Sequence, residues 1–216
     1  MIQLLLNGNY QVFVLLIIAL VISLSFHEFG HAVVAKWQGD DTAQRAGRMT
    51  INPLAHIDPM GLLMVVFIGI GYAKPVPTDP RNFKSQTSDL LVAAAGPFMN
   101  LLIALVTWNF FLYLVEAHGM QNEGVATFFV FLARINLLLM LFNLIPLGPL
   151  DGHYIFPHFL PRNLAMKYRM FNARYGVGIF LGLIALSFLG LPLFSYIAQA
   201  SAYMLDVITF VPTTRF

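Results

Sequence analysis

The chain has 216 residues, of which 58% are hydrophobic and only 10% are charged, with a net charge of +2 and a mean hydropathy of +0.74. A soluble domain has about 25% charged residues, so this composition excludes an ordinary soluble protein and indicates an integral, multi-pass protein of the cell membrane. Lys and Arg form no patch interleaved with aromatic residues, which excludes a nucleic-acid partner, and the absence of cysteine excludes disulfides and thiolate metal ligands.

Long apolar segments predict the membrane-spanning helices. Three of them are long enough to cross a hydrocarbon core, which needs about 20 helical residues. They lie at about 10–35, 89–117 and 125–148. A further apolar stretch at 176–211 is interrupted by Gly190 and Pro192. This stretch is too long for one crossing, so it is predicted to form two short helices joined by a turn.

The apolar segment 60–71 is too short to cross a membrane, and Lys and Arg lie on both sides of it. Because these residues favour the cytoplasmic side, both ends of the segment are expected there, which predicts a re-entrant element. Four more basic residues mark 162–174 as another cytoplasmic loop. Segments 1–9 and 117–124 contain neither Lys nor Arg and are expected outside, which places the N-terminus outside.

These elements predict an all-α polytopic membrane protein with about five transmembrane helices, a short re-entrant segment and a small cytoplasmic-side hairpin loop. The whole chain, 1–216, is expected to be a single membrane-embedded domain. Its core is predicted at about 10–160 and its C-terminal helices at about 176–211. The predicted topology brings the ends of the first and third long helices to the same depth, near the cytoplasmic face.

The sequence HEFGH lies near the cytoplasmic end of the first predicted helix. On a helix, His27 and His31 fall on one face, so both imidazoles can bind one metal ion, and Glu28 lies beside them as a base for metal-bound water. Ionisable side chains among so many apolar residues are costly and usually mark function. Without cysteine, the motif predicts a zinc site made of histidine and carboxylate ligands.

A catalytic zinc site usually takes three protein ligands, so HEFGH needs one more from elsewhere. Asp151, in the sequence NLIPLGPLDG, is the leading candidate because it follows the cytoplasmic end of the 125–148 helix. The alternative is a turn carboxylate that accepts hydrogen bonds from backbone amides ahead of Gly152. His56 and His153 are competing ligands. For His56, a loop histidine hydrogen-bonded to the backbone is the simpler interpretation. His153 follows Asp151 too closely for both side chains to point toward one metal ion.

HEFGH followed by NLIPLGPLDG resembles the site-2 protease family of intramembrane zinc metalloproteases, whose pattern is HExxH followed by a distal Asn-x-x-Pro and Leu-Asp-Gly. The sequence AAAGPFMN, with Gly96 and Asn100, is similar to the family's Gly-x-x-x-Asn motif, and INPLAHIDPMG is similar to the hairpin loop of compact prokaryotic members. The resemblance covers about 10–160. No segment is long or polar enough for the PDZ-type domain of some members, so the chain resembles the compact prokaryotic type without a PDZ domain.

The resemblance implies one Zn²⁺ ion held by His27, His31 and Asp151, with Glu28 activating the zinc-bound water. It implies a catalytic role for Asn143, which would position substrate or stabilise the developing oxyanion. An interhelical hydrogen bond is the alternative role for that amide. The implied substrate is the transmembrane helix of another protein in the lipid bilayer, cleaved in regulated intramembrane proteolysis or in clearance of signal-peptide remnants.

A catalytically silent, metal-binding membrane adaptor is the main alternative function. The intact Glu28 argues against it, because a purely structural metal site has no use for a base. A metal transporter is a second alternative. It would show internal repeats and polar groups through the middle of its helices, whereas the candidate ligands here converge at one depth.

Overall fold

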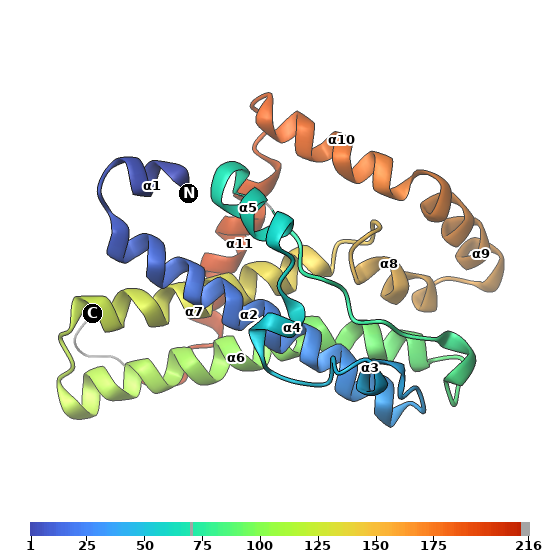
Figure 1. Ribbon diagram of the computed structural model, residues 1–216, viewed down its shortest axis with the longest axis horizontal. Coiled ribbons are helices and arrows are strands. Elements are labelled where there is room, and N and C mark those ends of the chain that lie inside the picture. The colour runs from blue at the N-terminus through green and yellow to red at the C-terminus, as the bar shows by residue number, and fades with distance from the viewer. Residues whose placement is uncertain (70, 213–216) are drawn as a thin grey trace.

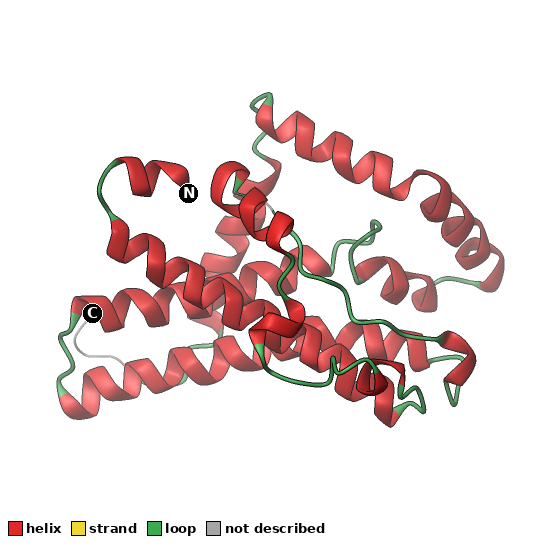
Figure 2. Ribbon diagram, in the orientation of Figure 1, coloured by secondary structure: helices red, strands yellow, loops and turns green. Residues whose placement is uncertain are grey.

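The computed structural model describes residues 1–69 and 71–212, and in this part of the chain the regular elements are all helices (Figure 1, Figure 2). Four helical stretches are long and apolar enough to cross a membrane. They are α2 (Tyr10–Trp37), α6 (Ser88–His118), α7 (Glu123–Asn143) and the continuous stretch Arg162–Phe188. The prediction of an all-α polytopic membrane protein is therefore confirmed, with four candidate spans in place of about five.

Two of the three long helices begin and end within two residues of their predicted bounds, whereas α7 ends at Asn143 and not near 148. The physical reason is Pro146, which disfavours a helical conformation at the residue before it, and Pro149 follows soon after. The residues between α7 and α8 (Gly152–Ile155) consequently form a series of tight turns.

The C-terminal region confirms one prediction and corrects another. Two helices joined by a turn occupy the predicted stretch, α10 (Val177–Phe188) and α11 (Leu193–Val207), and Gly190 in the turn has a φ of 103°. The expected loop at 162–174 is helical instead, because α9 (Arg162–Phe171) and a π-helical turn, η3 (Asn172–Gly176), run directly into α10. The basic residues of 162–174 indicate the side of the membrane and not a loop conformation. The Leu, Ala, Met, Lys and Arg residues of this region all have high helix propensity.

The helices α2, α6 and α7 pack on one another and form the centre of the molecule, and α11 packs against α7 (Figure 1). Small residues allow the close approach of α2 and α6: a Cβ atom on Gly30 would lie 2.8 Å from the carbonyl oxygen of Ala95. The fully buried Ala104 and Leu137 contribute to the apolar cluster between α6, α7 and the end of α11. This packing fixes the relative positions of the three helices that carry most of the site.

Short elements connect α2 to α6, and a short helix precedes α2. They are α1 (Ile2–Leu6), α3 (Thr42–Arg45), α4 (Pro53–His56), α5 (Pro59–Ile68) and η1 (Pro80–Asn82). The helix α5 occupies the segment predicted to be re-entrant. It starts at Asp58, whose side chain accepts a 2.9 Å hydrogen bond from the N–H of Gly61, and stops at Gly69, where φ is 86°. An isolated antiparallel bridge joins Ile57, which precedes α5, to Ala73, which follows it.

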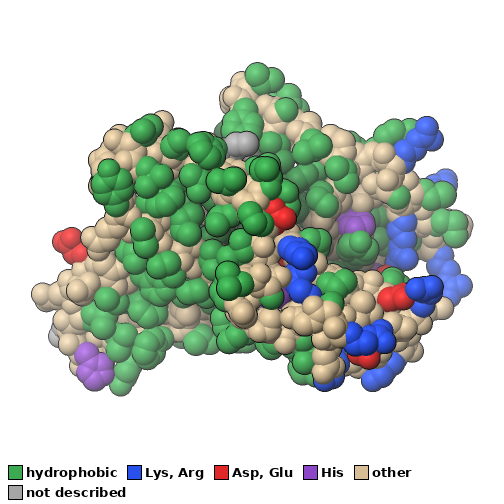
Figure 3. Space-filling model, viewed as in Figure 1, with side chains coloured by type: hydrophobic (Ala, Val, Ile, Leu, Met, Phe, Trp, Pro, Cys, Tyr) green, Lys and Arg blue, Asp and Glu red, His purple; other side chains and the backbone are tan. Residues whose placement is uncertain are grey.

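The region similar to a hairpin loop, INPLAHIDPMG, contains the helical turn α4 followed by the start of α5. An extended segment at 72–79 then runs alongside the second half of α2 toward η1 (Figure 1). Hydrophobic side chains cover much of the face shown in Figure 3, whereas most Lys and Arg side chains on it gather at the end where α3 and α9 lie. This distribution is typical of a membrane protein with one charged, aqueous-facing end.

Candidate metal centre

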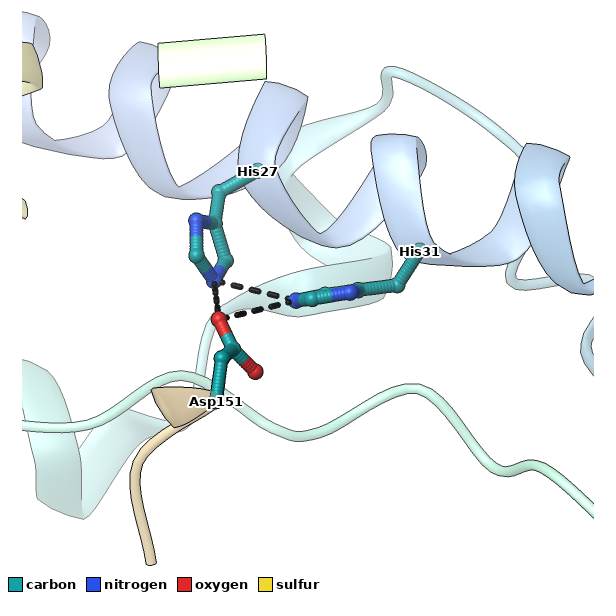
Figure 4. Close-up of side chains that lie close together, drawn as sticks. All are labelled: His27, His31 and Asp151. Atoms are coloured by element: carbon teal, nitrogen blue, oxygen red, sulfur yellow. Dashed lines mark hydrogen bonds and ion pairs between the residues drawn. The ribbon is translucent and has the colours of Figure 1, made fainter. Parts of the chain in front are cut away.

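The structure brings together the three side chains predicted to bind metal. His27 and His31 lie one turn apart on α2, and Asp151 approaches them from the start of α8 (Figure 4). The Nε2 atoms of the two histidines are 3.1 Å apart, and they lie 3.3 and 3.4 Å from Oδ2 of Asp151. Both histidines are buried, with 5% and 8% of their surface exposed.

The other ring nitrogen of each histidine has an oxygen partner in α6. Nδ1 of His27 lies 2.6 Å from Oδ1 of Asn100, and Nδ1 of His31 lies 2.7 Å from the carbonyl oxygen of Val92. A carbonyl oxygen can only accept, so Nδ1 is the protonated nitrogen in each neutral ring. Both Nε2 atoms consequently carry a lone pair, which is the state in which histidine binds a metal ion.

The donor atoms suit a zinc ion. Zinc lies about 2.0–2.1 Å from histidine nitrogen in tetrahedral sites, so two ligand atoms of one site are about 3.3 Å apart. The three separations of 3.1, 3.3 and 3.4 Å match this value. Oδ2 of Asp151 is buried and has no hydrogen-bond donor among the described residues. Three lone-pair atoms that face one another in this way repel unless a cation lies between them.

The surroundings of Asp151 argue against the alternative prediction, in which its carboxylate accepts hydrogen bonds from the backbone of a turn. This residue stands at the N-cap position of α8, but its side chain makes no capping hydrogen bond. Its Oδ2 is directed instead at the Nε2 atoms of both histidines, at 3.3 and 3.4 Å. The carboxylate is thus placed to bind a metal ion and not to cap the helix.

Glu28 lies beside the two histidines with 8% of its surface exposed. Its Oε2 accepts a 3.0 Å hydrogen bond from the backbone N–H of Val76, in the extended segment at 72–79. Val76 is not among the residues predicted from the sequence. The available signal is the sequence Pro75-Val76-Pro77, because proline has no backbone N–H and Val76 is the single possible donor of the three.

The Gly-x-x-x-Asn motif places both of its residues on the face of α6 that meets the histidines. A Cβ atom on Gly96 would lie 2.6 Å from Cε1 of His27 and closer still to the ring of His31. No side chain fits between α6 and these rings, so glycine is required for the close approach. Asn100, one turn later, is fully buried and holds His27.

The remaining candidates lie apart from the metal-binding group. His56 is fully buried and its Nε2 is 2.7 Å from the carbonyl oxygen of Thr50, which confirms the interpretation as a backbone-bonded loop histidine. Nδ1 of His153 lies 3.1 Å from the carbonyl oxygen of Leu150. Asn143 is partly buried at the end of α7, where its amide donates a 3.0 Å hydrogen bond to the carbonyl oxygen of Leu139.

The fold and the site together define a class: a multi-pass helical membrane protein with a group of two histidines and one aspartate suited to a metal ion. The chain belongs to "Peptidase family M50", the site-2 protease family, whose sequence pattern matches residues 15–120 and 112–185. It is therefore a metalloprotease of this family, a membrane-embedded peptidase, as the motifs HEFGH and NLIPLGPLDG suggested. No PDZ domain is evident in the described residues.

Curated relatives agree with this assignment. The chain is 39% identical over 188 residues to the "Putative zinc metalloprotease YwhC" of Bacillus subtilis, a match that covers 84% of this chain and 83% of the relative. It is 32% identical to the "Putative zinc metalloprotease Rip2" of Mycolicibacterium smegmatis, covering 69% of this chain and 59% of that protein. The Rip2 protein of Mycobacterium tuberculosis matches to the same extent, at 32% identity. No solved structure gave a significant match.

Proposed function

We propose that this protein hydrolyses a peptide bond in the transmembrane helix of another membrane protein, with one zinc ion held by His27, His31 and Asp151. The observation that carries the proposal is the convergence of two imidazole Nε2 atoms and one carboxylate oxygen beside the carboxylate of Glu28. Zinc in such a site polarises a carbonyl group and lowers the pKa of water. Membership of peptidase family M50 supports the same reaction.

Glu28 is the proposed proton carrier. Its Oε2 is held by the N–H of Val76, which fixes the carboxylate and leaves Oε1 for proton transfer. In the forward reaction Glu28 takes a proton from the attacking water, and it then returns that proton to the leaving amide nitrogen. Burial of the carboxylate between α2 and the segment at 72–79 keeps bulk water away from this transfer.

Asn143 is the proposed donor to the substrate carbonyl. Its amide is engaged with Leu139 one turn earlier, so a substrate must draw it away by rotation of the side chain. An amide N–H that binds the developing oxyanion more tightly than the ground-state carbonyl would lower the barrier. The interhelical alternative receives no support among the described residues, since the hydrogen bond that the Asn143 amide donates lies within α7.

The topology of the site is part of the proposal. We place the N-terminus outside, the metal centre near the cytoplasmic face and α5 as a re-entrant element, in one membrane-embedded domain. The bridge between Ile57 and Ala73 supports a segment that enters and returns at the same depth. The Lys and Arg side chains at the end of the molecule near α3 and α9 support the cytoplasmic assignment of that end (Figure 3).

The substrate helix must unwind before cleavage, because its peptide bonds are shielded by their own hydrogen bonds. Pairing of the unwound strand with the extended segment at 72–79 would hold it open for cleavage. The inward N–H groups there are used, since Lys74 donates to His56 and Asp79 donates to Asp40. An added substrate strand would therefore bond chiefly to backbone carbonyls. Deletion of this segment also removes the Val76 donor to Glu28, so Val76→Pro is its reference. Strand pairing has no support if the deletion lowers cleavage of helical relative to already unwound peptides no more than Val76→Pro does.

The deciding experiment compares the purified wild type with Glu28→Gln for cleavage of a helical transmembrane reporter, with bound zinc measured in the same samples. We expect the variant to retain zinc and to lose cleavage, because it removes the base but no ligand. If the wild type binds zinc and cleaves no transmembrane helix offered, the adaptor function is favoured. Reporters built from a membrane-anchored regulator and from a signal-peptide remnant separate the two substrate classes.

A further inference from the structure

A buried polar network crosses the three central helices behind the metal centre. Its side chains are those of Ser23 on α2, Asn100 on α6 and Asn136 on α7, and each of them is fully buried. The Nδ2 group of Asn100 donates to Oδ1 of Asn136 at 2.7 Å, and the Nδ2 group of Asn136 donates to Oγ of Ser23 at 2.7 Å. Burying an amide among apolar helices costs free energy unless its hydrogen bonds are satisfied. These two amides are satisfied by each other, by Ser23 and by backbone carbonyl groups.

The acceptor oxygens around the two amides fix the direction of their hydrogen bonds. The Nδ2 group of Asn136 also donates to the carbonyl oxygen of Leu132 at 2.7 Å, and the Nδ2 group of Asn100 faces the carbonyl oxygen of Ser23 at 3.3 Å. A flipped amide would place its own oxygen against one of these oxygens, which is repulsive. The carbonyl oxygen of Leu132 therefore fixes the amide of Asn136. The amide of Asn100 is held chiefly by Oδ1 of Asn136, because the carbonyl oxygen of Ser23 is the more distant of its two acceptors.

This orientation reaches the metal centre through Asn100. With its Nδ2 group engaged by Asn136 and Ser23, Asn100 presents only Oδ1 to Nδ1 of His27, 2.6 Å away. Because Oδ1 can only accept, the imidazole of His27 must carry its proton on Nδ1. Its Nε2 then keeps a lone pair that faces the metal site. We propose that Asn136 is a positioning residue, which sets the tautomer of His27 by holding the amide of Asn100 in one orientation. The proposal rests on the role of His27 as a metal ligand stated above.

Removal of the acceptor on α7 tests this directly. In Asn136→Leu the amide of Asn100 loses its strongest acceptor and becomes free to turn its N–H toward His27. We expect the metal-free variant to populate the Nε2-protonated form of His27, seen in the ring ¹⁵N chemical shifts of histidine-labelled protein, where the wild type shows the Nδ1-protonated form. We also expect zinc affinity, measured by chelator competition, to fall about tenfold, as for other outer partners of metal-binding histidines.

Two further variants separate orientation from general destabilisation. Asn136→Asp keeps an oxygen for Asn100 to donate to, and burial keeps its carboxyl protonated, so that its O–H replaces the N–H that faces Leu132. The wild-type tautomer and affinity are therefore expected to return. In Asn100→Asp a carboxylate faces His27 and has no N–H to present, so adding Asn136→Leu to it is expected to leave the tautomer unchanged. Asn136→Ala removes the same acceptor without steric demand and replaces the leucine variant if that variant does not fold.

A matched control comes from a second amide in α6. Asn109 donates to the carbonyl oxygen of Ile208 at 2.7 Å and ties α6 to the end of α11, far along the helix from the site. Asn109→Leu is expected to lower thermal stability without any change in the tautomer of His27 or in zinc affinity. If Asn136→Leu behaves in the same way as this control, the positioning role is refuted. The tautomer is read in metal-free protein, so this result is independent of whether the protein cleaves helices.

Discussion

The backbone N–H of Val76 donates a 3.0 Å hydrogen bond to Oε2 of Glu28, across 48 positions of the chain. The segment that carries Val76 is fixed on both sides of this contact. Before it, Lys74 donates to the carbonyl oxygen of His56 at 2.8 Å, and after it the N–H of Asp79 donates to Asp40 at 2.7 Å. The proposed base is thus held by an anchored backbone and not by another side chain.

Replacement of Val76 by proline is expected to reduce the rate of cleavage about tenfold while zinc binding is unchanged, because only the backbone donor to Glu28 is lost. Val76→Ala keeps the N–H and serves as the control, with activity expected close to wild type. The two variants are compared by kcat on a helical reporter and by zinc content. Equal activity of the two would show that the hydrogen bond does not position the base.

Gly96→Ala tests the close approach of α6 to the histidine rings. A methyl group there would lie 2.6 Å from Cε1 of His27 and would push the rings out of place. Displacement of reacting groups by about 1 Å can cost on the order of 100-fold in rate, so we expect a loss of at least that size, together with weaker zinc binding.

Gly182→Ala on α10 is the matched control for Gly96→Ala, since nothing lies within 4 Å of a Cβ atom at that position. It is expected to leave cleavage and zinc content as in the wild type. Normal zinc binding by Gly96→Ala would contradict the packing of α6 directly on the two imidazoles.

Asp151→Asn and His153→Gln together test the choice of third ligand. Only the aspartate has an oxygen directed at both Nε2 atoms, whereas His153 is directed at the carbonyl oxygen of Leu150. We expect zinc affinity to fall more than about 100-fold in Asp151→Asn, which exceeds the loss typical of a residue that only hydrogen-bonds a metal ligand. In His153→Gln we expect zinc affinity to be nearly unchanged. Zinc bound per chain after dialysis against a weak chelator is the measurement. The reverse order of effects would transfer the ligand role to the histidine.

The anchoring of the segment over Glu28 is expected to depend on pH. Burial raises the pKa of Asp40, but hydrogen bonds from Asn82, Thr42 and Asp79 outweigh it and lower that pKa from the ordinary value of 3.8. A lowered pKa in the folded protein means that the carboxylate stabilises the fold fully above that ordinary value. The contribution is lost as the pH falls below 3.8 and through the lowered pKa of the folded state.

Hydrogen exchange of the amides at 74–82 between pH 6 and pH 3 checks this dependence, with exchange corrected for its intrinsic pH effect. Protection is expected to fall at the acid end in the wild type, and Asp40→Asn is expected to show weaker protection throughout. Asp41→Asn is the control, because that carboxylate is half exposed and pairs only with Arg45 within α3 and its cap. Protection that stays constant down to pH 3 would contradict the anchoring role of Asp40.

Much of this architecture could be predicted from local sequence. The bounds of α2 and α6 follow from runs of apolar residues bordered by polar ones, and the separation of α10 from α11 follows from Gly190 and Pro192. The positive charges of 162–174 predict a cytoplasmic loop, whereas the region is helical. Charge reports the side of the membrane, and helix propensity is a separate property that the same residues satisfy.

The sequence by itself determined the chemistry of this protein. The spacing of His27 and His31, with a distal Asp-Gly pair, defines the metal donors, and Glu28 between the histidines is the base. Because the chain has no cysteine, these donors are restricted to nitrogen and oxygen. Only the tertiary structure decided which partners orient that set. The contact of Val76 with Glu28 and the network from Asn136 to His27 join residues 36 or more positions apart. Such contacts depend on how α2, α6 and α7 pack, and packing is a property of the assembled helices that no local pattern of residues encodes.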